Sequence, residues 1–212
     1  KMLEVLHQDF KADSLITFGE DAVHQALYLE RMAHCPVYGG TETEYFPLGE
    51  DCFSRMVEEL KKAERYIFLE YFIIEDGVMW DTILDILTEK VKAGVDVRVM
   101  YDDIGSMFTL PREYAAELEK RTGIQCCVFN PFVPILSLRL NNRDHRKILV
   151  VDGKVAFTGG INLADEYINK KVRFGHWKDS AIMVRGEAAW SMTVMFLTLW
   201  DYTREIFTED YD

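Results

Sequence analysis

The chain has 212 residues, enough for one substantial α/β domain or one domain plus a short extension. Hydrophobic residues make up 49% and charged residues 28%, a balance typical of a globular protein that buries a core. The formal net charge of -12 argues against DNA or RNA as the main substrate, although it does not exclude a local basic pocket.

The cysteines indicate the redox compartment of the protein, and the apolar stretches indicate whether it has a membrane-spanning helix. Four cysteines, none with C-x-x-C spacing, favour core cysteines in a reducing compartment over a disulfide framework. The longest uncharged apolar stretch, 188–200, is shorter than the ~20 residues that a membrane-spanning helix needs. We interpret it as part of a buried helix. No signal peptide is visible and the chain begins at Lys1, so we expect a soluble fragment excised from a longer protein.

Hydrophobic periodicity predicts alternating strands and helices after an irregular stretch that ends near Gly49. In chain order we expect a helix at 53–60, a strand at 66–74, a helix at 80–91, a strand at 95–101, a helix at 111–121, strands at 124–129, 148–151, 155–158 and 181–184, and a helix at 187–204. A tight turn at Asp152-Gly153 predicts a hairpin between two of these strands. The alternation indicates a sheet covered by helices.

Residues 132–140 form an apolar segment around a single arginine, Arg139. Such a segment can be a loop that touches lipid or a partner surface. Plain core packing explains the same composition, and both interpretations stay open.

The strongest chemical signal is a cluster that begins at His145. Side chains at i and i+2 of a strand share a face, so His145 and Lys147 place an imidazole beside an ammonium. Gly159 and Gly160 allow a backbone to come close to a bound group, and Asn162 adds an amide donor. These groups suit a tetrahedral phosphate. On spacing alone, a solvated strand edge and a simple glycine turn remain alternatives.

The spacing His145-x-Lys147-x4-Asp152, followed by Gly159-Gly160 and Asn162, resembles the signature of the phospholipase D superfamily. The flanks are similar to those of bacterial cardiolipin synthases, at 66–77, 101–106, 140–147 and 177–179. The resemblance implies an α/β domain at 35–212, with a mixed β-sheet flanked by helices on both faces. Residues 1–34 would then be an extension or linker that follows a membrane anchor.

The resemblance also implies a role for each matched residue. His145 would attack phosphorus and form a phosphohistidine, while Lys147 and Asn162 grip the phosphate oxygens. Asp152 matches the motif's aspartate and is grouped with the catalytic residues, although its turn position suggests a structural role. Asp179 matches an acid that hydrogen-bonds the histidine and fixes its tautomer, the alternative being a surface carboxylate. The family implies no metal and no cofactor.

A single His-x-Lys-x4-Asp motif is present, whereas the family joins two across one site. The other histidines lack the pattern: His7, His24, His34 and His176. We therefore expect the amino-terminal catalytic half of a longer protein, or else a chain that completes its site as a homodimer.

The expected reaction is phosphatidyl transfer between two phosphatidylglycerol molecules, at the cell membrane of a bacterium. Expected partners are phosphatidylglycerol, a second phospholipase D-like half or a homodimer partner, and the membrane surface, but not nucleic acid. A phospholipase D-like hydrolase or nuclease that uses water is one alternative. An isolated half-site that is catalytically silent is another.

Overall fold

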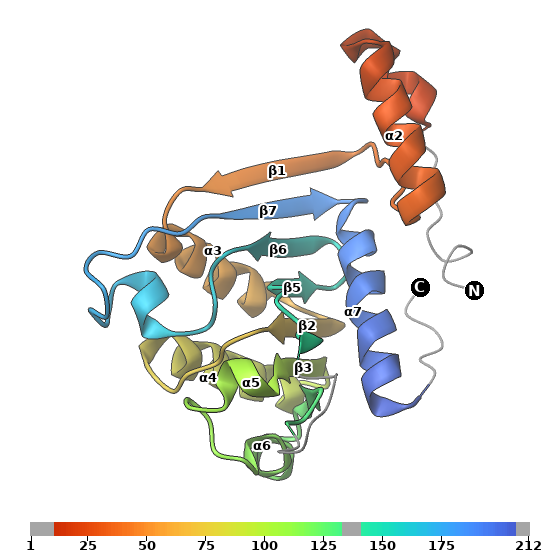
Figure 1. The fold of residues 1–212 in the computed structure, drawn as a ribbon. Helices are drawn as coiled ribbons and strands as arrows, with labels where there is room; N and C mark the ends of the chain where they lie inside the picture. Colours follow the sequence, from red (N-terminus) through yellow and green to blue (C-terminus); the bar gives the residue numbers. More distant parts are fainter. Residues whose placement is uncertain (1–10, 133–140, 207–212) are drawn as a thin grey trace.

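A computed structural model describes residues 11–132 and 141–206, and in these residues seven strands form one mixed sheet. Its order is β1-β7-β6-β5-β2-β3-β4 (Figure 1). β2, β3 and β4 are parallel, whereas every other neighbouring pair is antiparallel. The strands are β1 (Thr41–Phe46), β2 (Tyr66–Tyr71), β3 (Asp96–Asp102), β4 (Gln125–Phe129), β5 (Ile148–Val151), β6 (Val155–Gly159) and β7 (Ala181–Gly186).

Helices cover both faces of this sheet, as predicted. α3 and α4 pack against one face and α7 crosses the other (Figure 1). The helical segments are η1 (Ala12–Phe18), α2 (Glu20–Ala33), α3 (Gly49–Lys62), α4 (Val78–Lys92), α5 (Asp103–Ser106), α6 (Tyr114–Thr122), η3 (Asp165–Ile168) and α7 (Ala189–Arg204). Within the described residues, every helix is too short or too polar to cross a bilayer.

β2 is buried on both faces, which explains why its sequence is almost continuously apolar. Ile67 and Leu69 belong to the core beneath α3 and α4, while Phe68 belongs to the core beneath α7. There the Phe68 ring stacks on Phe196 with a centroid distance of 4.7 Å, and Phe196 stacks on Trp200 at 5.6 Å. The two cores therefore hold β2 in the middle of the sheet.

The predicted hairpin between β5 and β6 is confirmed. Asp152 and Gly153 both adopt positive φ, 54° and 66°, at the centre of a turn that the Lys154 N–H closes by donating to the Val151 oxygen at 3.0 Å. The Asp152 carboxylate accepts backbone N–H groups of Glu64, Arg65 and Tyr66 at 2.8–2.9 Å. This side chain therefore ties the hairpin to the start of β2.

Among the elements that escaped prediction, β1 and α2 bury little of their surface. β1 was part of the stretch read as irregular, and only Phe46 among its residues is buried. Pairing with β7, rather than an apolar pattern, makes it a strand. α2 buries only Val23 and Ala26 and stands beside the end of β1, away from the main body (Figure 1). The predicted division at residue 34 stays a prediction.

The strand predicted at 66–74 ends earlier, at Tyr71. The next amide groups leave the sheet, because Ile73 donates to Asn162 Oδ1 and Ile74 donates to Ser106 Oγ. The apolar segment 132–140 lies outside the described residues except for Phe132, so its two interpretations both stay open.

We predict that Asp152→Ala lowers the free energy of unfolding by about 2 kcal/mol, since three amides lose a charged acceptor. Asp152→Asn keeps one acceptor oxygen and tolerates positive φ, so it should lose roughly half as much. Urea denaturation of the three proteins measures the difference. Equal midpoints for wild type and Asp152→Ala would contradict this anchoring role.

Candidate active site

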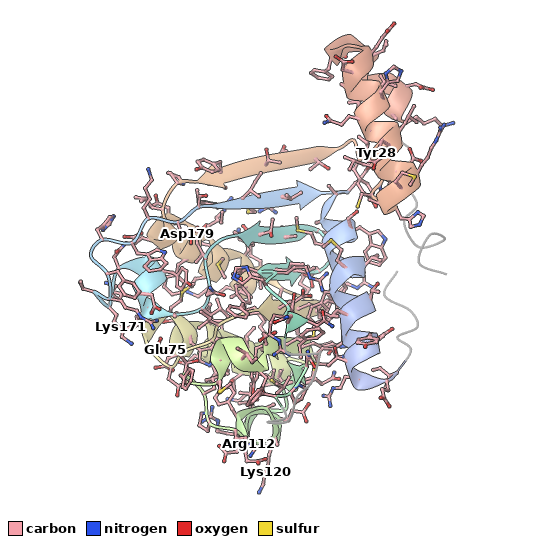
Figure 2. The ribbon with its side chains drawn as sticks, viewed as in Figure 1. Tyr28, Glu75, Arg112, Lys120, Lys171 and Asp179 are labelled. Carbon is pink, nitrogen blue, oxygen red and sulfur yellow. The ribbon has the colours of Figure 1, made fainter. Side chains whose placement is uncertain are left out.

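The residues predicted to carry chemistry, apart from Asp152, gather at one end of the sheet. β2, β3 and β6 end there, and β5 and β7 begin there. Figure 2 shows Asp179, Lys171 and Glu75 at this end, far from Tyr28 of α2. Asp152 lies at the opposite end of β5, in the hairpin turn. Its contacts there are with the backbone that precedes β2, not with the cluster around His145.

His145 and Lys147 share one aromatic neighbour, Phe72. The exposed His145 ring lies 4.8 Å from the Phe72 ring, and Lys147 Nζ lies 5.4 Å from the same centroid. Lys147 also donates a 2.7 Å hydrogen bond to the backbone oxygen of His145. The exposed imidazole and the buried ammonium therefore meet at Phe72, although both residues precede β5 and so do not share a strand face.

Lys147 is only 4% exposed although it carries an ammonium group. Burial lowers its pKa to about 8, and the nearby carboxylates of Asp144 and Asp179 oppose part of that shift. The described residues give Nζ one backbone acceptor, which leaves two of its three N–H groups to bind an anion. A largely buried ammonium group with N–H groups left to donate is suited to holding phosphate oxygens.

Asn162 is buried as well, and its amide already holds the protein together. Its Oδ1 accepts the Ile73 N–H at 3.0 Å, and its Nδ2 donates to the Tyr167 hydroxyl at 2.7 Å. One N–H of the amide remains outside these two contacts. Asn162 thus fixes the loop after β2 that carries Phe72.

The space beside the two glycines, Gly159 and Gly160, is filled by other parts of the protein. A Cβ on Gly159 would lie 2.4 Å from the Ser180 oxygen, and one on Gly160 would lie 2.0 Å from Asp179 Oδ1. The expectation that these glycines admit a bound group therefore has a different physical basis: they admit β7 and the Asp179 carboxylate. That carboxylate accepts the Ser180 N–H at 2.8 Å.

Asp179 is placed near Lys147, whose charge it supports. In the described part of the chain, no hydrogen bond joins Asp179 to the His145 imidazole. Its orienting role toward that ring therefore stays a prediction. Asp179 is partly buried, which fits neither a fully shielded orienting acid nor a fully exposed surface carboxylate.

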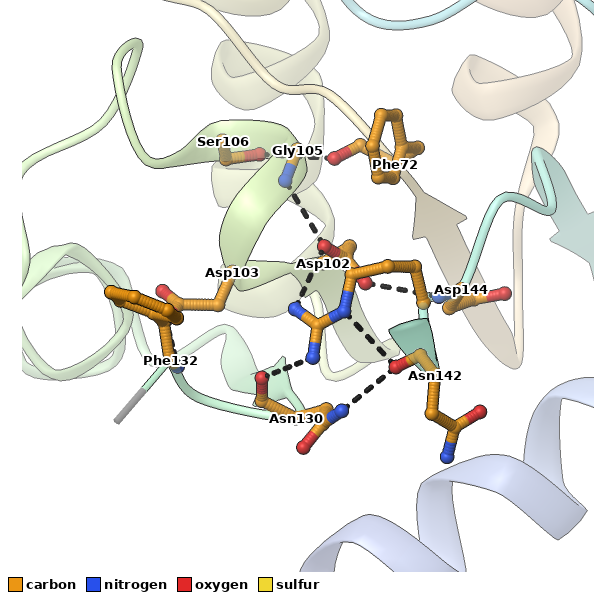
Figure 3. A network of polar contacts seen from close by, with 10 residues as sticks. Phe72, Asp102, Asp103, Gly105, Ser106, Asn130, Phe132, Asn142 and Asp144 are labelled. Atoms are coloured by element: carbon orange, nitrogen blue, oxygen red, sulfur yellow. Dashed lines mark hydrogen bonds and ion pairs between the residues drawn. The ribbon is translucent and has the colours of Figure 1, made fainter. Parts of the chain in front are cut away.

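Sequence reasoning missed a network of buried polar groups under the segment that carries His145 (Figure 3). Asp102 is fully buried and accepts the amide groups of Gly105 at 3.0 Å and Asp144 at 2.9 Å. It also accepts from Arg143 Nη1 at 3.3 Å, while Nη2 of that arginine donates to the Asn130 oxygen. An Asp-Asp pair at the end of a buried strand was the available signal.

The four cysteines differ in their exposure. Cys52, Cys126 and Cys127 are buried free thiols, and burial raises the pKa of each. Cys35 is exposed, contrary to the expectation of core cysteines throughout. Across residues 11–132 and 141–206, no three His, Cys, Asp or Glu side chains are arranged to hold a metal ion.

Solved structures share this fold. Phosphatidylserine synthase from Haemophilus influenzae Rd KW20 has a TM-score of 0.59 at 13% identity, over 79% of this chain and 40% of that chain. Nuc from Salmonella typhimurium, described as a phospholipase D family member, has a TM-score of 0.54 at 18% identity, over 78% and 93%. The fold is thus the phospholipase D-like fold.

Sequence comparison is more specific. The profile described as "Cardiolipin synthase, PLD-like domain" matches residues 56–192, so the chain belongs to that family. The cardiolipin synthase of Geobacillus sp. (strain WCH70) is 40% identical over 184 residues, which cover 85% of this chain and 36% of that protein. The chain spans between 36% and 39% of the length of the first curated relatives that it matches.

We predict that sulfate, whose charge is constant near neutrality, binds more weakly as the pH rises through about 8. Lys147 carries its charge below that pKa and loses it above. Lys147→Gln should bind sulfate weakly at every pH and lose this step. Calorimetric titration between pH 6.5 and 9.5 measures both proteins, and a step of equal size in Lys147→Gln would contradict the assignment.

We also predict that Gly160→Ala pushes the Asp179 carboxylate away from its present position, because the new Cβ would overlap Oδ1. The pKa of Lys147 should then fall below about 8, since Asp179 raises it. Asp179→Asn is the matched control without the added methyl group and should shift that pKa in the same direction. Carbon NMR of the lysine side chain reads this titration, and an unchanged pKa in both variants would contradict it.

Proposed function

We propose that this domain is the half of a cardiolipin synthase that carries the nucleophile, and that it transfers a phosphatidyl group between phosphatidylglycerol molecules. The observation that carries the proposal is the exposed His145 imidazole beside the buried, charged Lys147. The family to which the chain belongs supports the lipid substrate. The acidic net charge disfavours a polynucleotide.

In the proposed first step, a ring nitrogen of His145 attacks the donor phosphorus. The new P–N bond forms as the P–O bond to glycerol breaks, and glycerol leaves with a proton from a second histidine. Lys147 and the free N–H of Asn162 bind the phosphate oxygens, where charge builds up. Asp179 supports the charge of Lys147 and, by resemblance, orients the imidazole.

In the second step, a hydroxyl group of another phosphatidylglycerol attacks the phosphohistidine. The P–N bond breaks, cardiolipin is released and His145 is regenerated, while the second histidine takes up the hydroxyl proton. The second histidine belongs to a further phospholipase D-like half, which the relatives' greater length accommodates. A homodimer is the alternative source. It is suggested by Nuc, in which a single copy of this fold accounts for 93% of the chain.

A hydrolase or nuclease that uses water would share the first step and differ only in the acceptor. Product analysis separates the two functions once the site is complete. Cardiolipin and glycerol from phosphatidylglycerol support the transferase. Phosphatidic acid, or cleaved polynucleotide without lipid turnover, would overturn it.

The isolated chain allows a test of the nucleophile itself. Nitrophenolate leaves without needing a proton, so a nitrophenyl ester of phosphatidic acid bypasses the missing histidine. We expect the chain to form an acid-labile adduct on His145 with this ester, and none with phosphatidylglycerol. Mass spectrometry of the digested protein locates the adduct.

His145→Ala should lower the rate of adduct formation by roughly 10³-fold or more, as expected when a nucleophile is removed. His176→Ala is the matched control, because that histidine is also exposed and precedes Asp179 by three residues. An adduct on another residue, or an undiminished rate in His145→Ala, would contradict the proposal.

A further inference from the structure

Two buried acids lie beneath the segment that presents His145. Glu70 is the penultimate residue of β2 and is fully buried, and Asp144 is 5% exposed. Arg146 Nε lies 2.6 Å from Glu70 Oε1 and 3.2 Å from Asp144 Oδ1. Two carboxyl groups therefore share one guanidinium nitrogen, directly beside the predicted nucleophile.

The hydrogen bonds of these acids are incomplete unless one is protonated. Asp144 Oδ1 accepts from the backbone and side chain of Arg146, but its buried Oδ2 has no donor among the described residues. Both Glu70 oxygens are likewise buried without a hydrogen-bond partner there, although Oε1 forms the ion pair with Arg146. Ionised Glu70, Asp144 and Asp179 would set three negative charges against the two positive charges of Arg146 and Lys147, and an uncompensated buried charge is costly. A hydrogen on Glu70 that points to Asp144 Oδ2 removes the charge and satisfies the orphaned oxygen.

Among the described residues, Arg146 is the basic side chain that acts on Glu70, whereas Lys147 lies near Asp144 and Asp179. The neighbours of Glu70 in register, Met100 on β3 and Ile148 on β5, are apolar. From β4 the titratable group that faces it is Cys127, a buried thiol. Burial first, and then Asp144, raise the pKa of Glu70 to about 9, and Arg146 only partly opposes them. Glu70 is thus neutral at pH 7.

These contacts determine where His145 points. Arg143 turns inward to Asp102 on one side of His145, and Arg146 turns inward to Glu70 and Asp144 on the other. Both flanking arginines are therefore tied to buried acids, and the histidine between them faces outward against Phe72.

We infer that Glu70 and Asp144 are positioning residues, joined by one shared proton, that hold the 143–146 backbone so that His145 faces the substrate. The inference deepens the proposed function and rests on it for its catalytic consequence. Raising the pH removes the shared proton, and the two carboxylates then repel each other under the nucleophile. Since the ordinary pKa of a glutamate is near 4.5, this group weakens the folded state progressively as the pH rises from there to about 9.

Carbon-detected NMR of the wild-type chain tests the shared proton, because it tolerates the fast amide exchange of alkaline solution. We expect the Glu70 carboxyl carbon to titrate near pH 9, together with the backbone carbons of 142–146. Glu70→Gln stays neutral and keeps a donor, so it should fold normally and lose the backbone transition. Asp144→Asn should lower the midpoint, since the repelling charge is gone.

Glu59→Gln is the matched control, as Glu59 is a buried glutamate on α3 that pairs with Lys62 and Arg185, away from this segment. It should leave the transition unchanged. Glu70 ionised at pH 7, or an unchanged transition in Glu70→Gln, would overturn the inference. If Glu70→Gln failed to fold, the wild-type titration alone would decide.

The catalytic consequence is read from adduct formation with the nitrophenyl ester at pH 7. Glu70→Ala should slow it by about 10²-fold, the cost of a nucleophile displaced by about 1 Å, whereas Glu70→Gln should restore a near wild-type rate. Equal rates in Glu70→Ala and wild type, with the fold intact by circular dichroism, would refute the positioning role. If wild type forms no adduct, the proposed function fails, while the NMR titration still decides the carboxyl pair.

Discussion

Asp102 is fully buried where β3 ends, and a buried carboxylate is stable only when donors surround it. Its donors come from three places: the first turn of α5 through Gly105, the amide of Asp144, and the side chain of Arg143. One side chain thereby joins β3, α5 and the segment before β5. The backbone on which His145 sits is held by this requirement, because any displacement would leave the charge of Asp102 unpaired.

The need of buried polar and charged groups for partners also explains the surroundings of Lys147 and Asn162. Lys147 is almost as buried as Asp102, and its charge is supported by Asp179, which packs against the bare Cα of Gly160. Asn162 completes the arrangement by binding the loop that carries Phe72, the ring against which His145 rests. The described site therefore rests on buried polar groups that hold its backbone in place, while the imidazole of His145 is exposed.

Much of the fold was predictable because its strands are buried on both faces. β5 is apolar throughout and β2 is interrupted by Glu70 alone, and the Asp152-Gly153 turn carries a local signal that needs no tertiary context. β1 was missed for the opposite reason: an exposed edge strand needs only backbone partners, and those come from β7, far along the chain. The early end of β2 was also unpredictable, because side chains of Asn162 and Ser106 divert its amides.

The sequence by itself determined the family and the residues that match its motif, since both are read from residue types at set spacings along the chain. Only the tertiary structure decided what those residues do to one another. It assigns Asp152 to the start of β2, uses Gly160 to seat Asp179, and brings Arg146 to Glu70. These contacts join residues more than seventy positions apart, or nineteen in the case of Gly160 and Asp179, so they depend on strand order and on burial. Neither strand order nor burial is encoded in local spacing. The contacts that support the site residues therefore emerged only from the fold.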